Sequence, residues 1–111
     1  MGITKSQIFT ETQNEMADIF KVLGHPARLA ILDFVSQQDS CICNDLVNEI
    51  GLAQATISQH LKELKRIGLL QGTIEGKKLC YCINIDRWNE IQKTLNTFFK
   101  NTKNRFFHVD L

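Results

Sequence analysis

Four cysteines stand in two Cys-x-Cys pairs, Cys41 with Cys43 and Cys80 with Cys82. Side chains alternate between the two faces of a β-strand, so in an extended chain each pair places both thiols on one face. Neighbouring thiols can bind a soft thiophilic ion such as Zn(II), Cd(II) or As(III), or they can oxidise to disulfides. They can also be inert, because a free cysteine packs as a small hydrophobic residue. The spacing leaves these three uses open.

A second group of residues has the chemistry of a DNA-binding surface. Ile57, Leu61 and Leu64 repeat at the spacing of a buried helical stripe. The rest of residues 54–66 carries amides, hydroxyls and cations, with no carboxylate before Glu63. Amides and hydroxyls suit base edges, and this role is predicted for Gln54, Thr56, Ser58 and Gln59. Cations suit phosphates, and this role is predicted for Lys62, Lys65, Arg66, Lys77 and Lys78.

The elements that position these residues are predicted from periodicity and turn signals. Residues 44–68 are expected to form two helices joined by a tight turn, with Gly51 ending the first. Two β-rich runs around Glu75-Gly76-Lys77 predict a hairpin, a wing with Lys77 and Lys78 at its tip. The remaining predicted elements are helices over residues 6–23, 26–37, with Pro26 at its start, and 87–104, and a short strand over 40–43.

Together these elements predict one winged helix-turn-helix domain over residues 6–104, followed by a C-terminal tail over 105–111. The fold class is mostly α with a small β-hairpin wing, in the order helix, helix, strand, helix, helix, strand, strand, helix. His25 precedes the only proline and is predicted to cap or pack rather than to bind a ligand. The first and last helices carry broader apolar faces than one small core needs, which favours a homodimer through these two helices over packing within the monomer.

The charge is unevenly distributed along the chain. The 111 residues carry 13 basic and 12 acidic groups, for a net charge of +1. Residues 1–53 hold three basic and seven acidic groups, whereas residues 54–78 hold five and two. A local basic patch is what a nucleic-acid-binding surface requires, because phosphate neutralisation supplies most non-specific affinity. Solvated lysines on any helix would give a weaker version of this asymmetry.

The composition predicts a soluble protein that does not enter a membrane. Hydrophobic residues make up 43% of the chain and charged residues 23%. No stretch approaches the roughly 20 apolar residues that span a bilayer, and the start of the chain lacks the apolar run of a signal peptide. The expected location is the cytoplasm, where cysteines are reduced by default.

The order of the elements and three stretches of sequence resemble the ArsR/SmtB family of bacterial repressors. The stretches are residues 23–32 (LGHPARLAIL), 53–64 (AQATISQHLKEL) and 76–83 (GKKLCYCI). The resemblance implies a dimeric repressor that binds double-stranded DNA and is released when an inducer, often a metal or metalloid, binds. It also implies that the first and last helices form the dimer, and that His60 packs or contacts the backbone.

Four departures from the family pattern limit what can be carried over. Ala53 stands where many members have a serine that caps the recognition helix, a cap worth about 1 kcal/mol. Cys41 and Cys43 lie one position out of register with the usual metal ligands, which would fall on Ile42 and Asn44. The third thiol of arsenite sensors has no equivalent, and the last helix lacks the histidine that some relatives use for metal.

The winged-helix topology adds a prediction about the thiols. In that fold the short strand before the helix-turn-helix pairs with the second strand of the wing. Matching registers would place Cys41 opposite Cys82 and Cys43 opposite Cys80, with Cβ atoms about 4.5 to 5.5 Å apart. The other face of these strands would turn toward the core and carry Ile42, Leu79, Tyr81 and Ile83.

The predicted function is therefore a DNA-binding transcriptional regulator, most simply a dimeric repressor that needs no cofactor. A soft ion held by Cys41, Cys43, Cys80 and Cys82 is the first candidate effector, and thiol oxidation in the same fold is the alternative. A small thiol or metal-handling protein is a rival, but the chain lacks a Cys-x-x-Cys motif and a general base near the thiols, so no enzyme is predicted. A winged helix that binds protein instead of DNA is the other rival.

Overall fold

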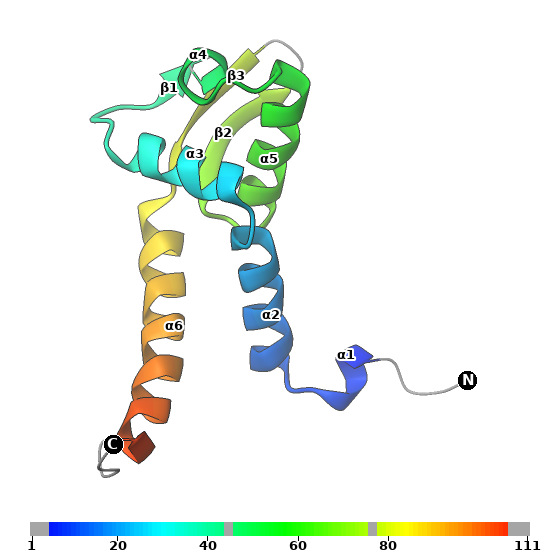
Figure 1. The fold of residues 1–111 in the computed structure, drawn as a ribbon, viewed down its shortest axis with the longest axis vertical. Coiled ribbons are helices and arrows are strands. Elements are labelled where there is room, and N and C mark those ends of the chain that lie inside the picture. Colours follow the sequence, from blue (N-terminus) through cyan, green and yellow to red (C-terminus); the bar gives the residue numbers. More distant parts are fainter. Residues whose placement is uncertain (1–4, 44–45, 76–77, 107–111) are drawn as a thin grey trace.

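The computed structural model describes residues 5–43, 46–75 and 78–106 (Figure 1). Its elements follow the predicted order, with one additional short helix at the start. They are α1 (Lys5–Ile8), α2 (Glu11–Leu23), α3 (Pro26–Ser36), β1 (Ile42–Cys43), α4 (Leu46–Ile50), α5 (Gln54–Arg66), β2 (Leu70–Glu75), β3 (Lys78–Ile83) and α6 (Ile85–Phe106). The mostly α winged helix-turn-helix fold is confirmed. Part of the predicted tail, residues 107–111, lies outside the described residues.

The prediction of one helix over residues 6–23 was wrong, because the chain breaks between α1 and α2. Thr10 has an extended backbone and caps α2. Its hydroxyl oxygen accepts a hydrogen bond from the Gln13 amide at 3.0 Å, and the Gln13 side-chain oxygen accepts one from the Thr10 amide at 3.0 Å. This reciprocal capping box fixes the start of the helix at Glu11.

Helix α3 begins at Pro26, as predicted, and ends at Ser36, one residue earlier than predicted. His25 caps it, as predicted, because its Nδ1 accepts a hydrogen bond from the Ala27 amide at 3.1 Å. Pro26 occupies the first helical position, where its missing N–H leaves no hydrogen bond unmade. Helix α6 is longer than predicted at both ends, and its first turn is capped by Asn84, whose side-chain oxygen accepts from the Arg87 amide.

The three strands form one antiparallel sheet in the order β1-β3-β2. Ile42 pairs with Tyr81 and Cys43 with Cys80, so the predicted register of β1 on β3 is confirmed. Strand β2 pairs with β3 along its whole length, from Leu70 opposite Ile83 onward. The wing is therefore joined to the strand that precedes the helix-turn-helix.

A single apolar core joins the helix-turn-helix to the sheet. It includes the predicted stripe of α5, together with residues of α2, α3, both long strands and the first turns of α6. Its most buried side chains are Ile19, Val22, Ile31, Leu46, Ile57, Leu61, Leu64, Leu70, Leu79 and Tyr81. Helices α2 and α6 extend away from this body on the same side (Figure 1). None of the described helices is long and apolar enough to cross a membrane.

Candidate nucleic-acid interface and cysteine cluster

Helix α5 presents a polar face opposite its buried stripe. Ile57, Leu61 and Leu64 are fully buried, as the spacing predicted. The predicted base-reading residues Gln54, Thr56 and Gln59 are exposed, and Ser58 is half-buried. Lys62, predicted for phosphate, is exposed on the same helix. Ala53 is the N-cap of helix α5 and makes no side-chain cap, as the absence of the usual serine implied.

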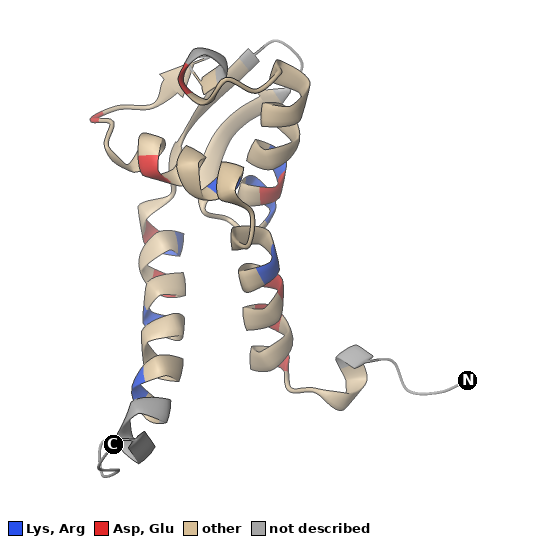
Figure 2. Cartoon of the chain, viewed as in Figure 1, with Lys and Arg blue, Asp and Glu red and all other residues tan. Residues whose placement is uncertain are grey.

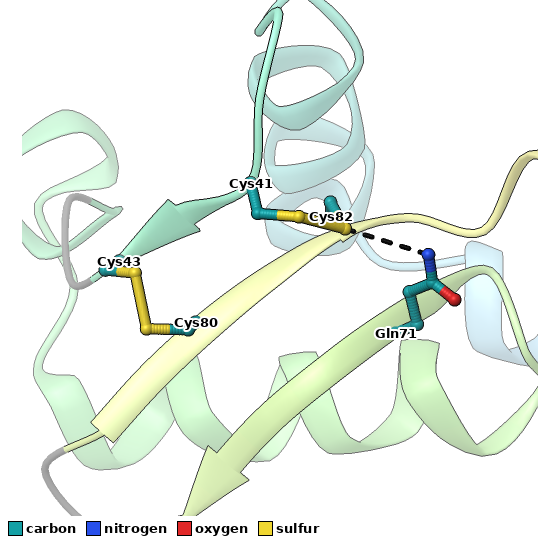
Figure 3. Close-up of a disulfide and its surroundings, with 5 residues drawn as sticks. All are labelled: Cys41, Cys43, Gln71, Cys80 and Cys82. Atoms are coloured by element: carbon teal, nitrogen blue, oxygen red, sulfur yellow. Dashed lines mark hydrogen bonds between the residues drawn. A yellow bond between two sulfur atoms is a disulfide. The ribbon is translucent and has the colours of Figure 1, made fainter.

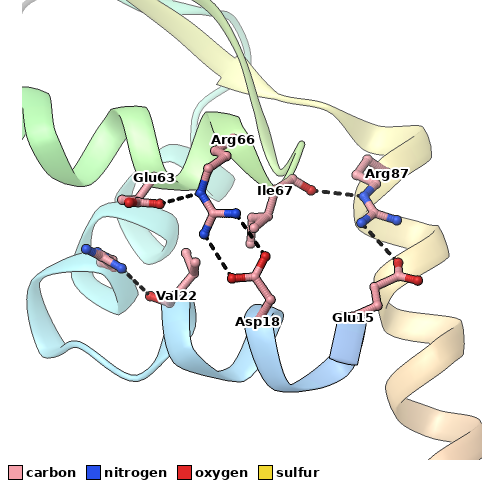
Figure 4. Close-up of polar contacts among 8 residues, drawn as sticks. Glu15, Asp18, Val22, Glu63, Arg66, Ile67 and Arg87 are labelled. Atoms are coloured by element: carbon pink, nitrogen blue, oxygen red, sulfur yellow. Dashed lines mark hydrogen bonds and ion pairs between the residues drawn. The ribbon is translucent and has the colours of Figure 1, made fainter. Parts of the chain in front are cut away.

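Two of the predicted phosphate ligands are engaged within the molecule. The Lys65 ammonium donates to the Gly72 carbonyl of β2, with Nζ and O 2.6 Å apart. The Arg66 guanidinium donates from Nη1 and Nη2 to the Asp18 carboxylate and from Nε to Glu63 (Figure 4). Lys65 thus connects the recognition helix to the wing by a hydrogen bond, and Arg66 connects it to α2 by an ion pair.

Arg87 forms a second set of contacts between elements, beside that of Arg66. Its Nε donates to the Ile67 carbonyl at 2.9 Å, just after the end of α5, and its Nη2 lies 3.3 Å from Glu15 of α2 (Figure 4). Most charges along α2 are carboxylates, with one cation, Lys21, in its last turn, whereas Lys65 and Arg66 lie in the last turn of α5 (Figure 2). An ion pair therefore connects the recognition helix to α2, and a hydrogen bond from Arg87 to the backbone just after α5 connects it to α6.

His60 makes more contacts within the protein than the sequence indicated. This imidazole is buried in α5, and its Nδ1 accepts a hydrogen bond from the Arg28 guanidinium of α3 at 3.1 Å. Its ring lies against that of His25, with centroids 4.5 Å apart. Burial lowers the pKa of His60, and the charges of His25 and Arg28 lower it further. His60 is thus a neutral acceptor that joins the recognition helix to α3, in agreement with its predicted packing role.

The wing is present, but the predicted tip residues are only partly described. Lys78 opens β3 and stands opposite Glu75 in the register. Lys77 lies outside the described residues. The antiparallel pairing of β2 with β3 places the connection between them directly after Glu75, in agreement with the predicted hairpin.

The four cysteines meet in the predicted pairs (Figure 3). Cys41 is joined to Cys82 and Cys43 to Cys80 by disulfide bonds across β1 and β3, with Cα atoms 4.5 and 4.2 Å apart. The opposite strand face is buried at Ile42, Leu79 and Tyr81 and half-buried at Ile83, as expected. Within the described ranges, no group of three or more histidine, cysteine or carboxylate side chains is arranged to hold a metal ion. The metal role of these cysteines stays a prediction.

Comparison with known proteins identifies the family. The model of the family described as bacterial regulatory protein, arsR family, matches residues 25–71. An uncharacterised HTH-type transcriptional regulator of Methanocaldococcus jannaschii is 38% identical over 87 residues, which cover 78% of this chain and 97% of that protein. The arsenical resistance operon repressor of Staphylococcus xylosus is 35% identical over 82 residues, covering 74% of this chain and 78% of the other.

A solved structure agrees with this assignment. The crystal structure of Mycobacterium tuberculosis Rv0081 matches with a TM-score of 0.59 and 25% identity, over 87% of this chain and 98% of that one. The helix-turn-helix, the wing and the sequence matches thus agree with one another. The chain belongs to the arsR family of bacterial regulatory proteins and is a DNA-binding transcriptional regulator, not an enzyme.

Proposed function

We propose that the protein is a dimeric repressor that binds an imperfect palindrome in double-stranded DNA and is released when its four cysteines change state. The observation that carries the proposal is the pairing of Cys41 with Cys82 and of Cys43 with Cys80 across β1 and β3. Strand β1 leads into the helix-turn-helix and β3 is half of the wing. A bond between these strands therefore acts on the two elements that contact DNA.

The DNA contacts are proposed from the exposed face of α5 and from the wing. The base-reading residues are Gln54, Thr56, Ser58 and Gln59. Phosphates are proposed to contact Lys62, Lys65, Arg66, Lys77 and Lys78. Lys65 and Arg66 must share or give up the acceptors that they already hold, so Lys62 is expected to contribute more to the salt dependence of binding.

The dimer is proposed to form through α2 and α6. Large apolar side chains remain exposed on these helices, and a second copy of the chain would cover them. Phe20 of α2 is 41% exposed, and on α6 Phe98 is 48% and Phe99 57% exposed. The rings of Phe20 and Phe99 lie 6.5 Å apart between centroids, which makes one continuous aromatic surface from the two helices.

The dimer is tested by Phe99→Ser, with Thr97→Ser as an exposed control on the same helix. We expect Phe99→Ser to sediment as a monomer at concentrations where the control is a dimer, and to bind a full palindrome little better than a half-site. Unchanged sedimentation of Phe99→Ser would contradict the proposed interface.

Oxidation is the effector that the cysteine geometry favours. The protein is expected to work in the cytoplasm, where thiols are reduced, so the disulfides would form on exposure to an oxidant. Disulfide formation would shift the population of wing positions toward one clamped to β1, and DNA affinity would change if DNA binds the other positions better.

A thiophilic ion is a second candidate, favoured by the similarity to the Staphylococcus xylosus protein named an arsenical resistance operon repressor. In the reduced protein the same four sulfurs would be the ligands of Zn(II), Cd(II) or As(III). Their strand positions support both candidates, since either effector links β1 to β3.

The test is fluorescence anisotropy of reduced protein on DNA from its own promoter, with free thiols counted in parallel. The additions are Zn(II), Cd(II), arsenite or diamide, each compared in the wild type and in Cys41→Ser/Cys80→Ser, which breaks both pairs. Release of the wild type with loss of thiols, absent from the variant, is the expected result. Equal release of both proteins would overturn cysteine gating and leave the DNA-binding assignment standing.

A further inference from the structure

The two cysteine pairs have different surroundings. Cys41 and Cys82 line a cavity of about 510 Å³ at the end of the sheet nearest to α6, within the roughly 300–1,000 Å³ of small-molecule sites. Cys43 and Cys80 are exposed and do not line this cavity. A molecule in the cavity would therefore meet only one of the two pairs.

The lining indicates what the cavity can hold. One part is apolar and is formed by Val35, Ile83, Ile85 and Trp88. The other part is polar and is formed by Ser36, Gln38, Asp39 and Ser40. The described lining contains no lysine or arginine, and the Asp39 carboxylate repels anions. These side chains suit a neutral molecule with an apolar body and a polar end.

Cys82 is the thiol of this pair that has a hydrogen-bond donor beside its sulfur. It is half-buried, and the Gln71 amide donates a hydrogen bond to its sulfur, with Nε2 and Sγ 3.8 Å apart (Figure 3). A donor to sulfur stabilises the thiolate, which is the reactive form of cysteine. Cys41 is bonded to Cys82 in the structure, so it is placed to complete the reaction.

We propose that this cavity binds a neutral organic hydroperoxide, which oxidises the pair Cys41 and Cys82 in preference to Cys43 and Cys80. The Cys82 thiolate attacks the outer oxygen of the hydroperoxide, the O–O bond breaks, and the alcohol leaves after taking up one proton. The resulting sulfenic acid is attacked by the Cys41 thiol, which forms the disulfide and releases water. Two thiols and one hydroperoxide thus give one disulfide, one alcohol and one water.

This proposal rests on the proposed cysteine gating for its regulatory meaning, but its chemistry can be measured without DNA. Trp88 lines the cavity and is the only tryptophan in the chain, so its fluorescence reports on the site. The probes are cumene hydroperoxide, hydrogen peroxide and oxidised glutathione, each mixed with reduced protein in a stopped-flow instrument. We expect cumene hydroperoxide to react at least tenfold faster than the other two, with Cys41–Cys82 as the first disulfide found by peptide mass mapping.

Matched variants separate the two pairs. Cys43→Ser/Cys80→Ser should keep the preference for cumene hydroperoxide, and Cys41→Ser/Cys82→Ser should lose it. Gln71→Ala should raise the pKa at which Cys82 reacts with iodoacetamide, which distinguishes a positioning role from a purely structural one. Cumyl alcohol, which has the same body and no peroxide bond, should change Trp88 fluorescence of the wild type and slow its oxidation, a measurement that needs no variant.

The outcomes distinguish this inference from the proposed function. Equal rates with hydrogen peroxide and cumene hydroperoxide, or first oxidation at Cys43 and Cys80, would overturn the cavity assignment. If hydrogen peroxide or cumene hydroperoxide nevertheless released the protein from DNA, cysteine gating would stand without the cavity assignment. Selective oxidation of Cys41 and Cys82 with DNA still bound would support the cavity and overturn gating.

Discussion

The Arg66 guanidinium, in the last turn of the recognition helix α5, forms two hydrogen bonds to the Asp18 carboxylate of α2, with lengths of 2.9 and 3.0 Å. The two residues are 48 positions apart in the chain. Because α2 also carries part of the proposed dimer surface, this pair connects the orientation of the recognition helix to the helix that would meet the second subunit.

Asp18→Asn should weaken that connection with only a small loss of stability, because exposed ion pairs contribute little. The Arg66 hydrogen bond lowers the pKa of Asp18 the most, and the charges of Arg66 and Lys21 add to this against an opposing effect of burial. The ionised carboxylate therefore stabilises the fold at pH values above its ordinary pKa of 3.8. This stabilisation is lost as the pH falls through the lower pKa of the folded state. Urea denaturation at pH 7 and pH 3 measures the effect, with Glu11→Gln on the same helix as the control. An equal loss of stability between pH 7 and pH 3 in Asp18→Asn and wild type would contradict this prediction.

Gln59 and Lys62 should differ in how they affect DNA binding. Gln59→Ala is expected to cost about 1 to 3 kcal/mol on the operator and little on random DNA, because its amide is proposed to contact a base. Lys62→Ala should weaken both complexes alike and reduce the slope of log affinity against log salt by about one. Anisotropy titrations at several salt concentrations separate the two patterns, and identical losses on operator and random DNA for both variants would refute the division.

The sheet register could be predicted from sequence because two independent signals agree. The Cys-x-Cys spacing fixes which residues share a strand face, and the winged-helix topology fixes which strands pair. The observed partners Cys43 and Cys80 satisfy both. The burial of Ile57, Leu61 and Leu64 was predictable for a similar reason, since a helical stripe is a local pattern.

The break between α1 and α2 was missed, although the sequence contained a signal for it. The apolar spacing continues through residues 6–23, but Thr10 and Gln13 have the spacing of a capping box. The contacts of Arg28 with His60 and of Arg66 with Asp18 had no such signal. The two residues of the first pair are 32 positions apart in the chain and those of the second pair 48, so only the packing of the helices brings them together.

Gly72→Ala should destabilise the wing strongly. Gly72 has a φ of 131°, and an added Cβ would collide with the Cys80 carbonyl oxygen and lie 2.8 Å from the Tyr81 Cα. Both are backbone atoms of the paired strand, which cannot move aside without breaking the sheet. We expect a loss of more than about 3 kcal/mol in urea denaturation, because backbone strain alone costs about 1 to 3 kcal/mol. Gly51→Ala is the control, because Gly51 also has a positive φ but nothing within 4 Å of an added Cβ, and it should cost about 1 kcal/mol. Similar losses in both variants would contradict the steric argument.

His60 should make the stability of the protein depend on pH. Its Nδ1 can accept the Arg28 hydrogen bond only while the ring is neutral there, and protonation would add a charge beside the Arg28 guanidinium. Since burial, followed by the charges of His25 and Arg28, lowers its pKa from 6.5, the unfolded chain binds a proton more readily than the folded one. The stabilisation is therefore complete above about pH 6.5 and is lost as pH falls below it. Urea midpoints measured from pH 7.5 to 5 should decline in the wild type and decline less in His60→Asn, whose side-chain oxygen can replace Nδ1 as an acceptor. The control is His25→Asn, which keeps a capping oxygen for α3 and should retain most of the decline in urea midpoint. An equal decline in His60→Asn and wild type would assign the titration to another group.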